Sequence, residues 1–269
     1  EMTGTVVERG AGARALAVGQ KVFVSARELA ERAGCYAEYI AVPQAAPFPL
    51  PAEADLEAAA CLSNYQVAYH LIHTATRGAP GKTALIGQAS GGLGSAAVQL
   101  AGLAGMTAIA MVGTPEKARA LLAFGADHAI DRSREDVAKR VADITNGAGV
   151  DLVLDAEGGP VLADYLAMLA PFGLLVSYGK LKGGLGPEVA AGLEGGPGYL
   201  NSGAVRVFTM HTLDDKPELR QRATQALIAR LLDGGIRPLV HACLPLKDAR
   251  HAHELLEARQ VIGKVLLKP

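Results

Sequence analysis

From residue 82 to residue 236, short apolar runs alternate with longer segments in which apolar residues recur every three or four positions. Short runs of this kind are typical of buried strands, and the longer segments are typical of helices that bury one face. The predicted strands are residues 83–86, 107–112, 128–130, 151–154, 174–178 and 205–210. The predicted helices are residues 93–104, 115–124, 134–145, 159–169 and 217–233. This alternation predicts an α/β fold, a doubly wound parallel sheet with helices on both faces.

Both ends of the chain follow a different pattern. Glycines separate short strands that are predicted at residues 5–7, 21–24 and 39–42. A stiff proline-rich connector follows at 47–51, and then a helix at 55–72. The last segment returns to strand, helix and strand, with the helix at 247–258 and the closing strand at 263–267. We therefore predict a β-rich domain from residues 1–60 and 237–269, and an α/β domain from residues 61–236.

One segment within the α/β domain stands out by its composition. Residues 183–198 contain seven glycines, which predicts a mobile loop.

Composition and charge narrow the classes of function. The 269 residues carry a formal net charge of −1 and show no basic stripe, which argues against a nucleic-acid partner. Three widely separated cysteines form neither a disulfide framework nor a zinc-ribbon spacing, as expected in a reducing compartment. No apolar run approaches the roughly 20 residues that cross a bilayer, and the start does not resemble a signal peptide. We expect a cytoplasmic protein with no membrane partner.

A glycine-rich turn between the first predicted strand and helix of the α/β domain is the main candidate for a ligand site. Ala89, Gly91 and Gly94 occupy the three fixed places of the Rossmann fingerprint G-x-G-x-x-G/A. Gly91 lets the backbone approach a pyrophosphate, Gly94 lets the helix pack against the strand, and the helix N-terminus offers N–H groups to phosphates. We expect dinucleotide binding at Ala89, Ser90, Gly91, Gly92, Leu93 and Gly94. The alternative is a glycine-rich turn without a ligand.

The end of the second strand indicates which dinucleotide binds. An NAD site places an acid there to hold the ribose 2′-hydroxyl, but residues 110–114 contain none. A carboxylate would repel a 2′-phosphate, so its absence permits NADP(H). Lys117 and Arg132 lie near the same edge of the predicted sheet and are candidates to contact the phosphate. The alternative is that both are solvated surface charges.

The sequence resembles the zeta-crystallin-like quinone oxidoreductases of the medium-chain dehydrogenase/reductase superfamily. The resemblance runs through the whole chain, and several segments carry it. They are residues 4–7 and 18–22, 34–39 (GCYAEY), 64–70 (NYQVAYH), 88–94 (QASGGLG), 113–117 (GTPEK), 124–131, 151–159 and 261–265 (VIGKV). Together these ordered matches are more specific than the glycine motif alone.

The resemblance implies a partial GroES-like catalytic domain beside the Rossmann domain, and NADP(H) as the cofactor. It implies that Gly113, Thr114 and Lys117 form the 2′-phosphate site and that Lys264 also contacts the cofactor. Gly179, after the fifth strand, is expected to let the backbone approach the cofactor. Members of this family commonly dimerise through the edge of the Rossmann sheet, so we expect a homodimer through residues 205–210.

The sequence departs from the family pattern in four places. Val67 replaces a common threonine, Glu157 replaces an apolar residue beside the dinucleotide, and Arg132 replaces a tyrosine near the adenosine phosphate. The family's catalytic domain also begins before the equivalent of Glu1, as in a fragment or a short natural form. We therefore expect this chain to bind NADPH, to reduce quinones poorly and to form a dimer or larger assembly.

The resemblance also bears on metal binding. Zinc-dependent relatives carry a cysteine ligand at the position of Ser63, and a hydroxyl is a poor ligand beside thiolate or imidazole. His70 with His73 and His251 with His253 lack a third ligand at a suitable spacing, so we predict no metal.

Two functions fit these observations. The first is an NADPH-dependent reductase that transfers hydride to a quinone or an α,β-unsaturated carbonyl, with an enoyl-thioester reductase as the alternative enzyme. Asn64, Tyr65 and Tyr69 are the candidate catalytic residues, although both tyrosines also suit packing. Asn201 and Ser202 are candidates to line the cleft. The second function is a sensor or scaffold that binds NADPH without catalysis.

Overall fold

The computed structural model describes residues 1–269. Contacts divide the chain into two compact units. The first unit joins Glu1–Gln66 to Gln221–Pro269, and the second is the continuous stretch Val67–Arg220. The sequence pattern predicts domain boundaries at residues 60 and 236, and the boundaries in the structure differ from these by 6 residues and by 16 residues. The roles assigned to the two domains stay predictions.

The second unit contains a parallel sheet of six strands in the order β6-β5-β4-β7-β8-β9. The strands are β4 (Thr83–Ile86), β5 (Thr107–Val112), β6 (His128–Asp131), β7 (Val150–Asp155), β8 (Leu169–Ser177) and β9 (Ala204–Val207). The chain runs outward from β4 to one edge, then returns to β7 and runs to the other. The strand order therefore reverses between β4 and β7, which is where open α/β sheets bind ligands. The predicted α/β fold is confirmed.

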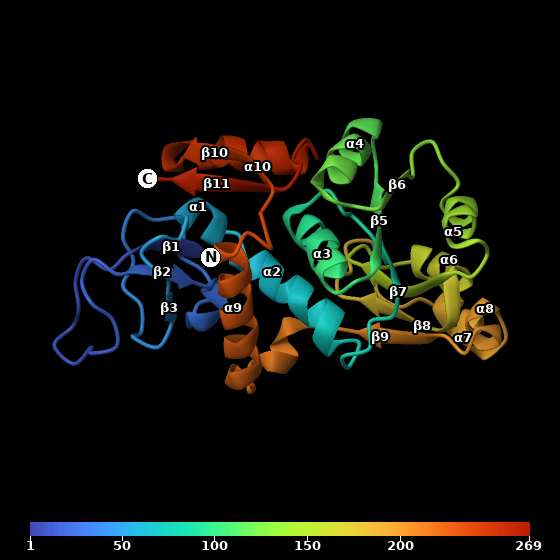
Figure 1. Ribbon diagram of the computed structural model, residues 1–269, viewed down its shortest axis with the longest axis horizontal. Helices are drawn as coiled ribbons and strands as arrows, with labels where there is room; N and C mark the ends of the chain where they lie inside the picture. The colour runs from blue at the N-terminus through green and yellow to red at the C-terminus, as the bar shows by residue number, and fades with distance from the viewer. The chain divides into compact units, whose positions relative to one another are not determined.

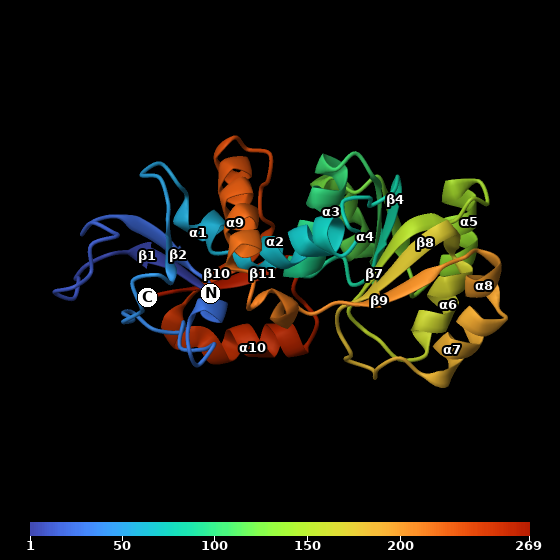
Figure 2. The same ribbon diagram turned by 90° about the horizontal axis from the view of Figure 1, so that it is seen from below.

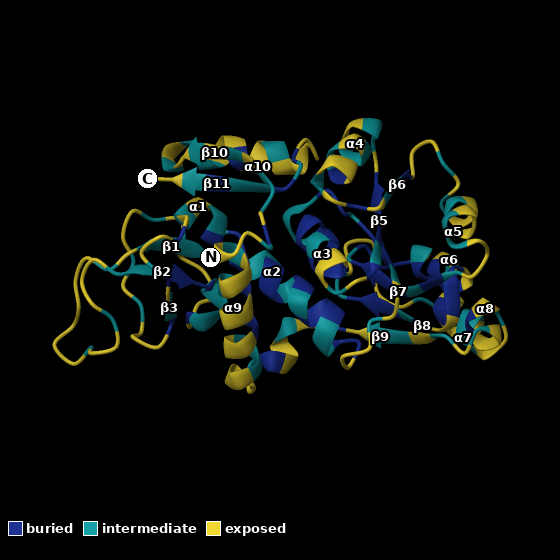
Figure 3. Ribbon diagram, viewed as in Figure 1, coloured by how far each residue is buried: buried dark blue, intermediate teal, exposed yellow.

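Helices cover both faces of this sheet, as Figures 1 and 2 show. On one face lie α3 (Gly92–Leu103) and α4 (Pro115–Phe124), and on the other α5 (Val137–Thr145) and α6 (Val161–Ala167). Buried residues concentrate on the central strands and on the inner side of α3 (Figure 3). Side chains such as Leu85, Ile109 and Val153, each at most 1% exposed, form this core. The apolar residues of the predicted strands are therefore buried in the core of this unit.

Most of the glycine-rich segment between β8 and β9 is helical, and only residues 183–186 and 195–196 lie outside the helices, so the predicted loop over 183–198 is wrong for the larger part of its length. It contains α7 (Pro187–Glu194) and α8 (Pro197–Leu200), and each helix has a proline in its first turn. The glycines allow close packing here: a Cβ on Gly192 would lie 2.8 Å from Leu166 Cδ1, and a Cβ on Gly196 2.9 Å from Gly192 Cα.

The first unit contains two small sheets. Strands β1 (Met2–Thr5), β2 (Lys21–Val24) and β3 (Pro47–Pro49) form an antiparallel sheet. Strands β10 (Val240–Pro245) and β11 (Lys264–Lys268) form a parallel pair. The α-helices of this unit are α1 (Leu56–Ala59), α10 (Ala249–Glu257), most of α9 (Pro217–Leu232) and the first part of α2 (Leu62–Tyr69).

The structure corrects two predicted elements of this unit. Residues 39–42 do not form a strand, and the predicted proline-rich connector contains β3. Phe48 pairs with Phe23 across the sheet, with ring centroids 6.1 Å apart, and proline is tolerated in such an edge strand. Ile40 and Val42 pack instead against a small core that includes Val24.

Side-chain contacts join the two chain segments that make up the first unit. Gln66 Nε2 donates to Thr224 Oγ1 at 2.6 Å, and Lys268 Nζ lies 2.9 Å from Glu57 Oε1. Lys264 forms an ion pair with Glu1. The unit is therefore closed by contacts between the beginning and the end of the chain.

The predicted helix at residues 55–72 is divided into three parts. Helix α1 begins after Asp55, whose carboxylate accepts from the N–H groups of Glu57 and Ala58. Helix α2 (Leu62–Tyr69) then continues into a π-helical turn, His70–Thr74. No helix of the chain is both long enough and apolar enough to span a bilayer.

Candidate functional site

The glycine-rich turn after β4 leads directly into α3. Gly91 is the N-cap residue of α3, with extended backbone at φ −80° and ψ 172°, and it has no side chain to cap the helix. The first hydrogen-bonded turn of α3 is closed by Ser95 N–H, which donates to the Gly91 carbonyl at 2.9 Å. The N–H groups of Gly92, Leu93 and Gly94 therefore precede the first hydrogen-bonded turn, and they carry the partial positive charge of the helix N-terminus.

Two glycines of this turn have different surroundings. A Cβ on Gly94 would collide with the Gln88 carbonyl oxygen and lie 2.6 Å from Ala89 Cα, so the packing of α3 against the turn requires glycine there. A Cβ on Gly91 would meet only the Gln88 carbonyl oxygen, at 3.7 Å, which is an ordinary contact. The protein itself therefore leaves the space at Gly91 open. An uncapped helix start beside an open glycine fits a pyrophosphate.

Hydrogen bonds hold this turn to both neighbouring strands. Ala89 N–H donates to the Met111 carbonyl on β5 at 3.1 Å. Gln88, which has a left-handed φ of 48°, accepts at Oε1 from Ala156 N–H, 3.3 Å away in the loop after β7. The turn is thus fixed at the point where the strand order reverses.

The predicted 2′-phosphate residues lie at the carboxyl end of β5. Thr114 caps α4 and accepts at Oγ1 from Lys117 N–H at 3.3 Å, which places Lys117 in the first turn of that helix. Gly113 is exposed, and a Cβ there would meet no atom within 4 Å. Arg132 follows β6 and donates its backbone N–H to the Val112 carbonyl at 3.0 Å. The structure therefore brings Gly113, Thr114 and Arg132 to one edge of the sheet, with Lys117 on the helix that begins there.

Two departures from the family pattern contact each other. Arg132 Nη1 lies 2.7 Å from Glu157 Oε2, and Arg132 Nη2 lies 3.2 Å from Glu157 Oε1. Lys182 Nζ lies 2.9 Å from Glu157 Oε1. The hydrogen bond from Arg132, followed by that from Lys182, lowers the pKa of Glu157 to about 2, although burial opposes this. The sequence marks Arg132 and Glu157 as two separate departures from the family pattern, and their pairing appears only in the structure.

Two other predicted cofactor residues have additional structural roles. A Cβ on Gly179 would collide with the Ala156 carbonyl oxygen, so the packing of two loops already requires glycine there. Lys264 belongs to the first unit, where it pairs with Glu1. The contact of each residue with a cofactor stays a prediction.

The three predicted catalytic residues lie on α2. Tyr65 is 2% exposed, and burial raises its pKa, which fits the packing alternative. Tyr69 is half-buried and packs against two histidines, with its ring centroid 4.5 Å from that of His73 and 5.6 Å from that of His70. Asn64 is also half-buried. The catalytic roles of all three residues stay predictions, and Tyr65 is the least accessible.

The expectation that Asn201 and Ser202 line the cleft is wrong. Both residues precede β9, at the amino end of the parallel sheet, whereas the phosphate-binding turn follows the carboxyl end of β4. Asn201 donates its side-chain amide to the Leu169 carbonyl at 2.9 Å, at the start of β8. This hydrogen bond connects the end of α8 to the amino end of β8.

Ser63, which the resemblance aligns with a zinc ligand of metal-dependent relatives, makes two polar contacts. Its backbone N–H donates to Glu1 Oε2 at 2.8 Å, and its hydroxyl lies 3.5 Å from Ser25 Oγ. Three or more His, Cys, Asp or Glu side chains do not converge anywhere in the structure in an arrangement that suits a metal ion.

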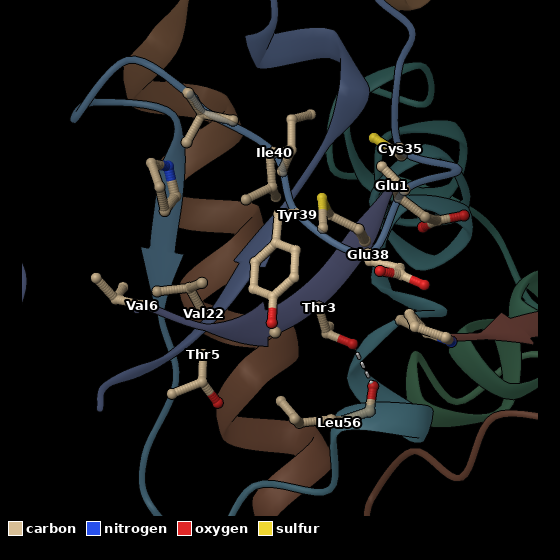
Figure 4. A pocket seen from close by; sticks show the side chains of 18 of the residues that line it. Glu1, Thr3, Thr5, Val6, Val22, Cys35, Glu38, Tyr39, Ile40 and Leu56 are labelled. Atoms are coloured by element: carbon tan, nitrogen blue, oxygen red, sulfur yellow. Dashed lines mark hydrogen bonds between the residues drawn. The ribbon is translucent and has the colours of Figure 1, made fainter. Parts of the chain in front are cut away.

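A separate hollow of about 1730 Å³ lies within the first unit. Figure 4 shows Thr3, Cys35, Glu38, Tyr39 and Leu56 around it, with Thr3 Oγ1 donating to the Leu56 carbonyl at 2.8 Å. None of the predicted catalytic residues lines this hollow.

Comparisons with known proteins agree with these features. Residues 92–225 match the family model described as zinc-binding dehydrogenase. The whole chain is 30% identical to 80% of a 2-haloacrylate reductase from Burkholderia sp and 32% identical to 81% of a quinone oxidoreductase from Pseudomonas aeruginosa. The crystal structure of Escherichia coli quinone oxidoreductase complexed with NADPH superposes with a TM-score of 0.85 at 29% identity, over 99% of this chain and 80% of that one.

These matches extend over both units and include the glycine-rich turn, the doubly wound sheet and the small antiparallel sheet. The chain belongs to the zeta-crystallin-like quinone oxidoreductase family of the medium-chain dehydrogenase/reductase superfamily.

Proposed function

We propose that this protein uses NADPH to reduce a quinone or an α,β-unsaturated carbonyl compound without zinc. Membership of the family makes the chain an NADPH-dependent oxidoreductase. The observation that carries the proposal is the turn at Gly91, where an uncapped helix N-terminus meets space that the protein itself does not fill. The neighbouring strand ends without an acid and is followed by Lys117, which favours NADPH over NADH.

The residues of the second unit divide the binding of the cofactor between them. The N–H groups at the start of α3 hold the pyrophosphate, and Lys117 holds the 2′-phosphate. When bound, NADPH supplies the hydride. Asn64 and Tyr69, both half-buried on α2, are the candidates to donate a hydrogen bond to the substrate oxygen.

The proposal that the reaction needs no zinc rests on Ser63. A hydroxyl replaces the thiolate ligand of metal-dependent relatives at this position, and a hydroxyl is a weak zinc ligand. Polarisation of a substrate carbonyl then depends on hydrogen bonds from the protein or from water.

A specific observation supports the carbonyl-conjugated alkene as a substrate class. One of the similar proteins, 30% identical along this whole chain, is named a 2-haloacrylate reductase, and a haloacrylate is an α,β-unsaturated carboxylate. The electron-poor carbon–carbon double bond of such a compound accepts hydride at its β-carbon. An enoyl thioester has the same conjugated alkene, so an enoyl-thioester reductase remains the alternative within this proposal.

The test is the oxidation of NADPH by the purified protein, followed by absorbance, with 1,4-benzoquinone and with methyl vinyl ketone as separate acceptors. We expect turnover with at least one acceptor, and turnover that persists in excess EDTA. The Gly91→Val variant supplies the background rate. NADPH binding without turnover on either acceptor would support the sensor or scaffold hypothesis. Stoichiometric zinc after dialysis, together with inactivation by EDTA, would contradict the zinc-independent mechanism.

We also propose a homodimer through β9. This strand forms one edge of the sheet, and its Val207 side chain is 65% exposed. A second copy that pairs with β9 would satisfy the backbone groups along this edge and cover the apolar side chain.

Light scattering after size exclusion tests this interface. The Val207→Asp variant should shift the protein from dimer to monomer, because a carboxylate buried in the contact costs solvation energy. Val7, which is 63% exposed in the first unit, provides a matched control, and Val7→Asp should leave the dimer intact. A Val207→Asp variant that stays dimeric would place the interface elsewhere.

A further inference from the structure

Arg132, Glu157 and Lys182 form a charged cluster at the carboxyl edge of the sheet in the second unit. Both guanidinium Nη atoms contact the Glu157 carboxylate, at 2.7 and 3.2 Å, so the pair is bidentate. Glu157 is buried, with its side chain 6% exposed, whereas the Arg132 side chain is 32% exposed. A bidentate pair fixes the plane of a guanidinium as well as its position. The burial difference places the arginine on the solvent side of its carboxylate partner.

This cluster spans the part of the sheet where a dinucleotide has to lie. Arg132 directly follows β6 and Glu157 lies two residues beyond β7, while β5 and β4 lie between those strands. Parallel strands are about 4.8 Å apart, so β6 and β7 are separated by roughly 14 Å. The ion pair therefore connects the loop after β6 to the loop after β7, across the carboxyl ends of β5 and β4. The phosphate-binding turn begins at the end of β4.

Loop packing fixes the carboxylate from the side of β8. Lys182 N–H donates to the Glu157 carbonyl at 2.7 Å, and Lys182 Nζ contacts the carboxylate at 2.9 Å. A Cβ on Gly159 would lie 2.6 Å from the Lys182 carbonyl oxygen, so the loops after β7 and β8 pack backbone against backbone. Glu157 is thus held by its own loop and by the next one, and it holds Arg132 in turn.

We propose that Glu157, supported by Lys182, holds the guanidinium of Arg132 as a flat stacking surface for the adenine ring of the cofactor. This inference rests on the proposed function, because it requires the dinucleotide to bind at the Gly91 turn. With the pyrophosphate on α3, the adenosine half extends toward the ends of β5 and β6. Arg132 is positioned there by the hydrogen bond from its backbone N–H to the Val112 carbonyl.

The orientation of Arg132 favours the adenine over the 2′-phosphate as its ligand. Two donors on the edge of the guanidinium point to Glu157, and the charge of that carboxylate balances the charge of the arginine. The exposed face of a guanidinium stacks well on aromatic rings. Lys117, on the neighbouring helix, then remains the residue that distinguishes the 2′-phosphate. Arg132 contributes equally to NADPH and NADH, because both contain adenine.

The test compares dissociation constants for NADPH and NADH, measured by fluorescence titration. Arg132→Lys retains the charge but lacks the flat face, and it should weaken both cofactors by a common factor of roughly ten, the scale of one lost base stack. Arg132→Tyr restores a flat ring and should bind both cofactors more tightly than Arg132→Lys does. Lys117→Ala is the matched control, and it should change the ratio of the two constants instead.

Glu157 is a positioning residue in this proposal, so its effect has to pass through Arg132. Glu157→Gln should weaken both cofactors in the wild-type background and have no further effect in the Arg132→Lys background. Circular dichroism establishes that each variant is folded. An Arg132→Lys variant that weakens NADPH alone would assign Arg132 to the phosphate, and one that binds both cofactors normally would exclude any role; either result overturns this inference alone. Failure of the wild-type protein to bind either cofactor would instead overturn the proposed function.

Discussion

Replacement of Gly91 by valine is expected to abolish NADPH binding while the protein remains folded. The backbone at Gly91 is extended, with φ −80° and ψ 172°, a conformation that valine adopts readily. A Cβ there would meet only one protein atom, at 3.7 Å, so the substitution creates no clash within the chain. The branched side chain would instead fill the space beside the helix N-terminus where the pyrophosphate binds. We expect affinity to fall by roughly a hundredfold or more, which corresponds to about 2.7 kcal/mol.

Fluorescence titration with NADPH measures the effect, and thermal unfolding shows whether the fold survives. Gly102 provides a control on the same helix, because it is exposed and a Cβ there would meet no atom within 4 Å. Gly102→Val should leave NADPH affinity unchanged and cost only a little helix stability. Gly94→Ala should destabilise the protein, because its Cβ would collide with the Gln88 carbonyl oxygen. Normal binding by a folded Gly91→Val protein would show that the pyrophosphate lies elsewhere.

The second large effect concerns the choice between NADPH and NADH. The wild-type protein should bind NADPH at least about tenfold more tightly, a difference of roughly 1.4 kcal/mol, and Lys117→Ala should remove most of that preference. The reason is that the ammonium group attracts the 2′-phosphate, while the end of β5 carries no acid to bind a free ribose hydroxyl. Titration of each protein with both cofactors measures the ratio.

Two further variants test whether the cofactor preference depends specifically on Lys117 and on the missing acid. Arg119 lies on the same helix with its side chain 73% exposed, and Arg119→Ala should leave the ratio unchanged. Gly113→Asp introduces the missing acid at an open position and should shift the preference toward NADH. Equal affinities of the wild-type protein for the two cofactors would contradict the assignment of Lys117.

The α/β unit could be predicted from the sequence because its strands are buried on both faces. A strand such as β5, whose last five residues are all buried, produces an unbroken apolar run that no surface segment imitates. The glycine-rich turn could also be predicted, because its glycines follow a fixed spacing and the packing of α3 requires a glycine at Gly94.

The errors arose where one local pattern has two physical meanings. The glycines near residue 192 predict mobility by composition, but in the structure they allow α7 and α8 to pack closely against neighbouring residues. The apolar residues at 39–42 predict a strand, but Ile40 and Val42 are only partly buried against a small core, and their backbone pairs with no other strand. The contact between Arg132 and Glu157 joins residues 25 positions apart across two intervening strands, so no local pattern could reveal it.

The division of the chain into one continuous unit and one assembled from both chain ends has a consequence for folding. The continuous unit, Val67–Arg220, has its own sheet and core and can acquire them from contacts within its own sequence. The other unit depends on contacts between residues that are far apart along the chain, such as those of Gln66 with Thr224 and of Glu1 with Lys264. Bringing distant segments together costs entropy that grows with the logarithm of the flexible length between them. A folded Val67–Arg220 replaces that flexible length with a rigid connection, so its early formation lowers the entropic cost of assembling the remaining unit.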